Sequence, residues 1–169
     1  MMAMGRMMES RGTRSVVWLV VSALAVLCAG WFHARATALQ MAGAYLERMQ
    51  APGAQLMRMD FDRAVLRSSN LARACLDGCN LNQADLSNAN LGGASLRSAT
   101  LVGANLQLAN LGAGSLRGAD LTNAHLEGAN LMAADLYDAR LLGATYNRYT
   151  TLPEGCDPSV SGMRFMDTH

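Results

Sequence analysis

A leucine recurs at every fifth position over most of the chain, and this spacing restricts the backbone more than any other feature. Sixteen consecutive positions of the series, from Leu66 to Leu141, are leucine, and Phe61 and Tyr146 extend it. Two places before these positions the residues are small, with fourteen alanines among the seventeen from Ala64 to Ala144. An α-helix turns about 100° per residue, so residues five apart share no face. One continuous strand is also excluded, because residues an odd number apart point to opposite faces.

The period instead fits a short extended piece followed by a corner. The small residue and the leucine are two apart, so both point inward and the residue between them points outward. The next two positions turn the corner, and Gly, Asn, Ser and Asp are frequent there. Stacked coils of this kind make a solenoid with a leucine interior, and four pieces per coil give twenty residues per turn. Asn before the leucine at positions 70, 90, 110 and 130 supports a repeat of twenty.

The repeats ADLSN, ANLGG, ANLQL, ADLTN, ANLMA and ADLYD resemble the A[DN]LXX motif of the pentapeptide-repeat family. The resemblance covers about Leu56 to Thr150 and implies an all-β fold, a right-handed quadrilateral β-helix of four to five coils. We place this solenoid at residues 54–152 and a C-terminal cap and tail at 153–169. Tyr146, Tyr149 and Leu152 break the leucine rule and are expected to seal the last coil. The chain end also resembles that of many family members, although Cys156 stands where an aromatic residue is common.

An apolar segment without charged residues, 16–32, lies near the N-terminus. We interpret residues 16–34 as a transmembrane helix after a basic cytoplasmic tail at 1–15, because arginines precede the segment and place the N-terminus inside. The alternative is a cleaved signal peptide that ends at Ala34-Arg35-Ala36. Both interpretations put the repeats on the non-cytoplasmic side of a membrane, periplasmic or lumenal, and the second makes the protein an exported one.

Residues 35–53 are expected to form an amphipathic helix and linker. Leu39, Ala42, Leu46 and Met49 fall at spacings of three and four, which is typical of one helix face. The pair Pro52-Gly53 would end that helix.

If twenty residues make a coil, residues twenty apart are stacked neighbours. The asparagine column then lies beside corners of small or uncharged residues, and we predict a flat, neutral interaction face consisting of Asn70, Asn90, Gly92, Gly93, Asn110, Gly112, Asn130 and Met132. On the neighbouring face, Asp77 would stack beside Arg97 and Arg117 beside Tyr137. His125 points outward and is interpreted as an isolated surface histidine.

Composition and motifs limit the classes of function that the chain could have. Residues 56–150 hold eight acids and eight arginines, so the solenoid is neutral and is not expected to bind nucleic acid. We find no motif of a catalytic, cofactor or metal site, and Cys75 and Cys79 lack a second pair. We therefore expect a membrane-tethered, non-catalytic structural or interaction module, with an unknown protein partner or a second copy. The alternative is a DNA mimic that binds a topoisomerase, as some family members do, and the neutral surface disfavours it.

Overall fold

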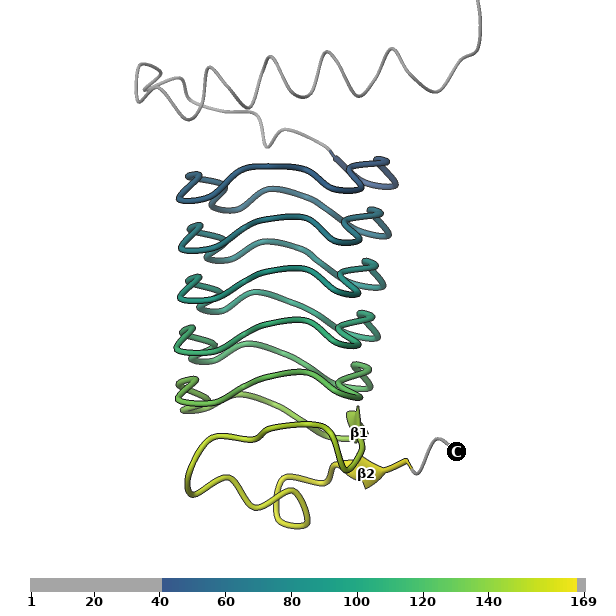
Figure 1. Cartoon of the computed structure of the whole chain (residues 1–169), viewed down its shortest axis with the longest axis vertical. Helices are drawn as coiled ribbons and strands as arrows, with labels where there is room; N and C mark the ends of the chain where they lie inside the picture. The colour runs from purple at the N-terminus through teal and green to yellow at the C-terminus, as the bar shows by residue number, and fades with distance from the viewer. Residues whose placement is uncertain (1–40, 167–169) are drawn as a thin grey trace, which may run out of the picture.

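The computed structural model describes residues 41–166, which wind into a stack of flat coils (Figure 1). The outward residue of each repeat forms a parallel bridge with the residue twenty positions later, from the pair Tyr45–Val65 to the pair His125–Thr145. Residues 41–140 thus make five complete coils of twenty residues, and an incomplete sixth follows. The predicted coil length and the predicted outward position are both confirmed.

The core is a filled column of leucine and alanine. Every leucine of the series from Leu66 to Leu131 is at most 1% exposed, and the alanines two places earlier are buried with them. Backbone hydrogen bonds link the coils in both directions: the amide of Leu101 donates to the carbonyl of Asp120 at 2.7 Å, and the amide of Thr100 donates to that of Cys79 at 2.9 Å. Each coil is therefore held on both sides by its neighbours.

The corners have one repeated geometry. The second residue after each inward centre has a positive φ, whether it is a glycine such as Gly103 (φ 65°) or a larger residue such as Leu108 (φ 58°). The carbonyl of Leu101 accepts a hydrogen bond from the amide of Ala104 at 3.0 Å, as in a type II turn, which requires a positive φ at its third position. This requirement explains the Gly and Asn at these corners.

The predicted helix at 35–53 is wrong over the part that the structure describes. Residues 41–53 continue the five-residue frame, with Met41, Leu46 and Ala51 pointing inward at 5%, 3% and 3% exposure. Met49 takes the small inward position, and the pair Pro52-Gly53 forms a corner with φ 70° at the glycine. Inward positions of this fold alternate between spacings of two and three, so a short stretch can imitate a helical spacing. The solenoid therefore begins at or before Met41, earlier than the predicted residue 54.

The segments interpreted as a basic tail (1–15) and as a transmembrane helix or signal (16–34) lie outside the described residues. Within residues 41–166, no helix is long and apolar enough to span a membrane.

The C-terminal end closes with a small parallel sheet of two strands, β1 (Thr145–Tyr146) and β2 (Arg164–Phe165). The ring of Tyr146 meets that of Phe165 edge-on, with centroids 5.5 Å apart. Leu152 packs partly buried against the core, whereas Tyr149 is 68% exposed. Two of the three residues expected to seal the last coil therefore do so, and Tyr149 does not.

Candidate interaction face

The asparagine column forms a continuous ladder of side-chain hydrogen bonds. Each amide nitrogen donates to the amide oxygen one coil earlier: Asn90 to Asn70 at 3.4 Å, Asn110 to Asn90 at 3.1 Å, and Asn130 to Asn110 at 3.3 Å. Each oxygen also accepts the backbone amide two residues later, at 3.1 Å for both Gly92 and Gly112. The ladder therefore fixes the side chains and satisfies their oxygens internally.

The two glycines beside the ladder leave little free space. A Cβ atom on Gly92 would lie 3.0 Å from Nδ2 of Asn110, and one on Gly112 would lie 3.2 Å from Oδ1 of Asn110. These contacts are tighter than ordinary van der Waals distances. The absence of side chains here thus lets the amides lie flat against the backbone.

The predicted residues share one face, but they differ in exposure. Asn90, Asn110 and Gly93 are exposed, Asn70 is half-buried, and Met132 is 61% exposed at the C-terminal side. The face also extends beyond the predicted set. In the corner column of Gly93, residues Ala113 and Ala133 are exposed and have positive φ values of 54° and 57°. Ala113 and Ala133 could have been identified from the sequence, because they occupy the second corner position, twenty and forty residues after Gly93.

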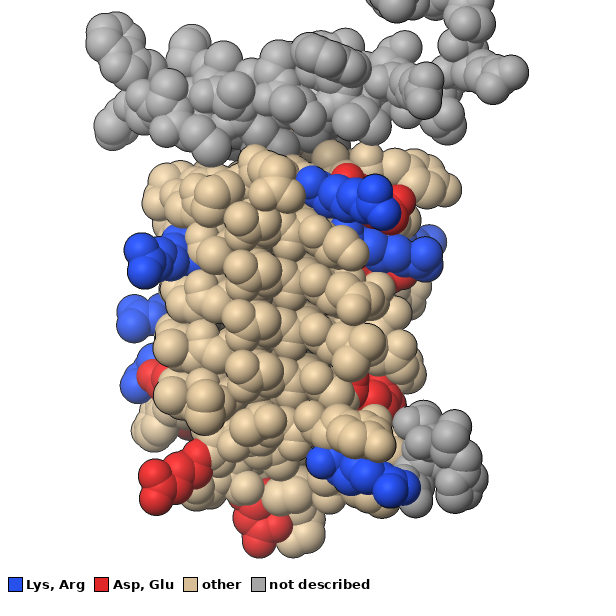
Figure 2. Space-filling view, viewed as in Figure 1, with Lys and Arg blue, Asp and Glu red and all other residues tan. Residues whose placement is uncertain are grey.

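Charge is absent from this face over three coils. Residues 89–93, 109–113 and 129–133 contain no Asp, Glu, Lys or Arg. Figure 2 shows a face of the rod on which an uncharged band runs along the long axis, with blue and red side chains at both margins. The other three outward columns each contain a charged residue, such as Asp85, Asp120 or Asp135. The asparagine face is therefore the neutral side of the rod.

The neighbouring face is charged and differs in part from prediction. Arg117 lies 4.5 Å from the ring centroid of Tyr137, which confirms the predicted contact. Asp77, however, does not pair with the guanidinium of Arg97. Its carboxylate accepts hydrogen bonds from Ser95 Oγ at 2.6 Å and from the backbone amide of Arg97 at 3.0 Å. The side chain of Asp77 therefore lies against the rod and accepts a hydrogen bond from the corner of the next coil.

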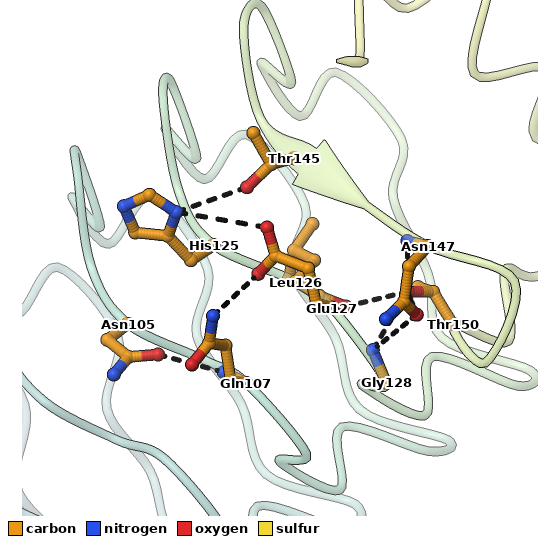
Figure 3. A network of polar contacts seen from close by, with 9 residues as sticks. All are labelled: Asn105, Gln107, His125, Leu126, Glu127, Gly128, Thr145, Asn147 and Thr150. Carbon is orange, nitrogen blue, oxygen red and sulfur yellow. Dashed lines mark hydrogen bonds and ion pairs between the residues drawn. The ribbon is translucent and has the colours of Figure 1, made fainter. Parts of the chain in front are cut away.

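His125 is not isolated, because it faces a carboxylate that sequence reasoning missed. Its Nδ1 lies 4.0 Å from Oε1 of Glu127 and 3.1 Å from Oγ1 of Thr145 (Figure 3). Glu127 is only 8% exposed, and Gln107 donates to its other oxygen at 3.1 Å. Burial opposes its charge, but hydrogen bonds from Thr145 and Gln107, with the nearby His125, hold the pKa of Glu127 below its ordinary value.

This polar network fastens the last regular coil to the C-terminal segment. The backbone amide of Gly128 donates to Oδ1 of Asn147 at 3.0 Å and to Oγ1 of Thr150 at 3.1 Å (Figure 3). At this place the coil spacing changes, because Asn130 pairs with Thr151, twenty-one residues later. Both contacts of His125 are made by the same ring nitrogen, Nδ1. The network therefore connects the last regular coil to the segment with Asn147 and Thr150, at the place where the repeat changes register.

The cysteines of the described residues are free thiols. Cys79 is buried and its Sγ donates to the carbonyl of Leu56 at 2.8 Å, and burial raises the pKa of this thiol to about 11. Within residues 41–166, no group of three or more His, Cys, Asp or Glu side chains could hold a metal ion.

Solved structures of repeat proteins are similar to this chain. A pentapeptide repeat protein from Nostoc Pcc 7120 is 39% identical, over 63% of this chain and 84% of the other, with a TM-score of 0.49. One from the thylakoid lumen of Arabidopsis thaliana is 33% identical, over 71% and 74% of the two chains, with a TM-score of 0.35. A plasmid-mediated fluoroquinolone resistance protein, QnrB1, is 15% identical, over 76% and 79%, with a TM-score of 0.33. No curated protein sequence matches this chain.

The family comparison covers most of the solenoid. The family model for pentapeptide repeats matches residues 40–78, 74–112 and 115–145 in eight copies. These ranges span more than half of the 169 residues, and their first residue agrees with a solenoid that starts at or before Met41. The chain is thus a member of the pentapeptide repeat family, whose fold is a right-handed β-helix.

Proposed function

We propose that this protein is a membrane-tethered, non-catalytic interaction module that binds a protein partner on its asparagine face. The observation that carries this proposal is the ladder itself, a rigid and neutral strip along one side of a charged rod. Solenoids commonly use such extended surfaces for binding.

The physical argument for docking rests on the cost of removing water. The amide oxygens of Asn90 and Asn110 already accept two hydrogen bonds each within the rod. A partner that covers them strips little water from unsatisfied acceptors, and the fixed side chains lose little rotamer freedom. The centre of the face carries no charge, and its margins do, which is the usual arrangement of a protein interface.

The proposed tether is the apolar segment 16–34, which a short stretch of sequence connects to the rod. Six residues, 35–40, separate that segment from Met41. Even fully extended, the seven intervals from residue 34 to Met41 reach at most about 25 Å. A retained membrane segment would therefore hold the first coil close to the bilayer. Intact-mass measurement of the native protein tests this step, because cleavage after Ala36 would give a chain that starts at Thr37.

The docking test uses two pairs of substitutions with the same change of charge. Ala113→Arg with Ala133→Arg adds two guanidinium groups at the border of the asparagine face. Ser98→Arg with Asn123→Arg adds them at other corners of the rod. All four positions are exposed and have positive φ, and the chain already tolerates arginine in that conformation at Arg58 and Arg73.

Partners are captured on the full-length protein from detergent-solubilised membranes of the native host. We expect a partner that the unsubstituted protein and the Ser98/Asn123 variant retain, and that the Ala113/Ala133 variant loses. Equal retention by both variants would refute docking on this face.

A further inference from the structure

Two exposed apolar side chains stand on opposite margins of the asparagine face. The asparagine column is flanked in three successive coils by a first margin, residues 87–88, 107–108 and 127–128, and a second margin, residues 92–93, 112–113 and 132–133. Leu108 on the first margin is 62% exposed, and Met132 on the second margin is 61% exposed. Neither side chain contributes to the core of the rod, so both are available to a partner.

A glycine determines where the Leu108 side chain lies. A Cβ atom on Gly128, one coil later, would lie 2.6 Å from Cδ2 of Leu108. Any larger residue at this position would therefore displace the leucine. Because Leu108 extends over Gly128, it covers the first margin of the coil that carries Met132 on its second margin. The two apolar side chains thus lie at the same height along the rod, on opposite sides of the face.

The two margins differ in size within each coil. Exposed Asn88 on the first margin lies across the face from the pair Gly92-Gly93. One coil later, Leu108 lies across from Gly112-Ala113. In the next coil the order is reversed, with Gly128 on the first margin and Met132 on the second. Each of the three coils therefore has a larger exposed side chain on one margin and small residues on the other.

A two-fold axis parallel to the rod makes this face complementary to itself. Such an axis places the first margin of one copy against the second margin of the other, with each coil opposite its equivalent. Leu108 of one copy then lies against Ala113 and Met132 of the other, and symmetry repeats the contact, as in an isologous dimer. In an antiparallel pair centred on the same coils, Leu108 would meet its own copy and the bare corner Gly112-Ala113 would face itself.

The charges of the face are compatible with an identical copy. Glu127 is the one ionisable residue in the two margins, and it is 8% exposed and accepts a hydrogen bond from Gln107. Identical surfaces with a net charge repel one another, whereas these coils present no exposed charge. Nearer the N-terminus, Arg67 and Arg73 would lie opposite one another, and Asp85 compensates Arg67 with a contact of 2.5 Å.

The size of the face indicates a dimer that depends on the membrane. Five coils at about 4.8 Å each and a width of about 20 Å give about 500 Å² per copy. Stable dimers in solution usually bury about 800 Å² per partner. Tethering in one bilayer would hold two rods in the same orientation and raise their effective concentration, which offsets the small area.

We propose that the partner on the asparagine face is a second copy of this chain, bound side by side as a parallel dimer with its two-fold axis along the rods. This inference rests on the proposed function and specifies its partner. Leu108 and Met132 of opposite copies make the apolar contacts, the two asparagine ladders line the axis, and both N-termini point to the same membrane.

Crosslinking of the full-length protein in lipid vesicles tests this arrangement. The background carries Cys28→Ala, Cys75→Ser, Cys79→Ala and Cys156→Ser, and its circular dichroism must match that of the unsubstituted protein. The purified protein is reconstituted at a defined ratio of protein to lipid and treated with a bismaleimide shorter than the width of the face, which is about 10 Å for three extended residues.

Pairs of cysteines determine the orientation of the copies. Leu108→Cys with Ala113→Cys in one chain should give a covalent band of twice the chain mass, because each position faces the other one in the second copy. Each single substitution should give at least tenfold less dimer, because equal positions lie on opposite margins. Ser98→Cys with Asn123→Cys is the matched control at exposed corners of positive φ away from the face, and should give none.

A charge pair tests the same contact without crosslinking. Leu108→Arg should lower energy transfer between copies labelled at the C-terminus at least tenfold, because it places a guanidinium in each apolar contact. Adding Ala113→Glu to that variant should restore energy transfer, since each carboxylate then faces a guanidinium of the other copy. Ala113→Glu alone should not increase it.

The proposal is overturned if the paired cysteines give no more dimer than the Ser98/Asn123 control, or if Ala113→Cys alone gives as much dimer as the pair, which would indicate antiparallel copies. It is also overturned if Leu108→Arg leaves energy transfer unchanged or if Ala113→Glu fails to restore it. A protein that is monomeric in vesicles but loses a partner of another mass with Ala113→Arg and Ala133→Arg would overturn this proposal and leave docking on the asparagine face standing.

Discussion

Truncation of a central leucine tests how the rod is stabilised. Leu101 is 0% exposed and lies between Leu81 and Leu121, one coil away on either side and equally buried. Leu101→Ala removes three carbon atoms, which corresponds to about 2.4 kcal/mol of lost burial at about 0.8 kcal/mol for each. A residual cavity adds to this loss when the surroundings cannot collapse. Here they are pinned by backbone hydrogen bonds of 2.7 Å from Leu81 to Thr100 and from Leu101 to Asp120.

We therefore expect Leu101→Ala to lower the free energy of unfolding by about 3–5 kcal/mol, in the upper part of the range for such changes. Leu136→Ala is the matched control, because Leu136 is half-buried at the C-terminal end of the rod and can relax, and we expect a loss of about 1–2 kcal/mol. The assay is urea unfolding of the full-length protein followed by far-UV circular dichroism, with the denaturant slope compared between variants. A loss below about 1 kcal/mol at Leu101, or equal losses at both positions, would refute the argument that the stacked coils prevent collapse.

Four further predictions concern single groups and the alternative function. The buried hydroxyl of Ser69 has no hydrogen-bond partner in the described residues, so Ser69→Ala should stabilise the fold by about 1 kcal/mol in the same urea assay, and a loss of stability would contradict this. Because burial raises the pKa of the Cys79 thiol to about 11, Cys79 should react with a maleimide far more slowly than Cys75, as measured by tryptic digestion and mass spectrometry. The contribution of this thiol to stability should fall as pH rises from 9.0 toward 11. The Thr122 hydroxyl donates to Asp120 at 2.5 Å and lowers the pKa of that carboxyl, so Thr122→Val should raise the pKa of Asp120 in a carbon-13 NMR titration. In the unsubstituted protein the hydrogen bond stabilises the fold above about pH 4, and this stabilisation is lost as pH falls through the lowered pKa. For the DNA-mimic alternative, a neutral rod should leave supercoiling by gyrase unaffected, and inhibition at stoichiometric protein would favour that alternative over docking.

The repeating part of the fold could be predicted because each inward position repeats the same physical requirement. Leu66 to Leu141 and the small residues before them determine the coil, the core and the outward columns, and the ladder from Asn70 to Asn130 follows from the twenty-residue spacing. The start of the solenoid could not be found in this way. There Met41, Ala51 and Met49 replace the usual leucine and alanine, and the remaining spacing imitates a helix.

Single contacts also lay beyond the pattern. The sequence places Asp77 beside Arg97. Its hydrogen bonds with the Ser95 hydroxyl and a backbone amide depend on side-chain rotamers, which the repeat does not determine. Glu127 occupies an outward corner, where burial is unusual. It becomes buried because the segment with Asn147 folds over it, and a change of register by one residue is not visible in the repeat. The path of residues 153–161 likewise has no repeat to guide prediction.

The central claim is that the asparagine face contacts a protein partner, and site-specific photo-crosslinking tests it most directly. p-Benzoylphenylalanine is placed at Ala113 on the border of that face, and at Ser98 and Asn123 on other corners, in the full-length protein in native membranes. All three positions are exposed corners with positive φ, so they differ in direction rather than in backbone conformation. We predict one discrete crosslinked band from position 113 and none of that mass from 98 or 123. The same band from all three positions, or no band from position 113, would contradict the account.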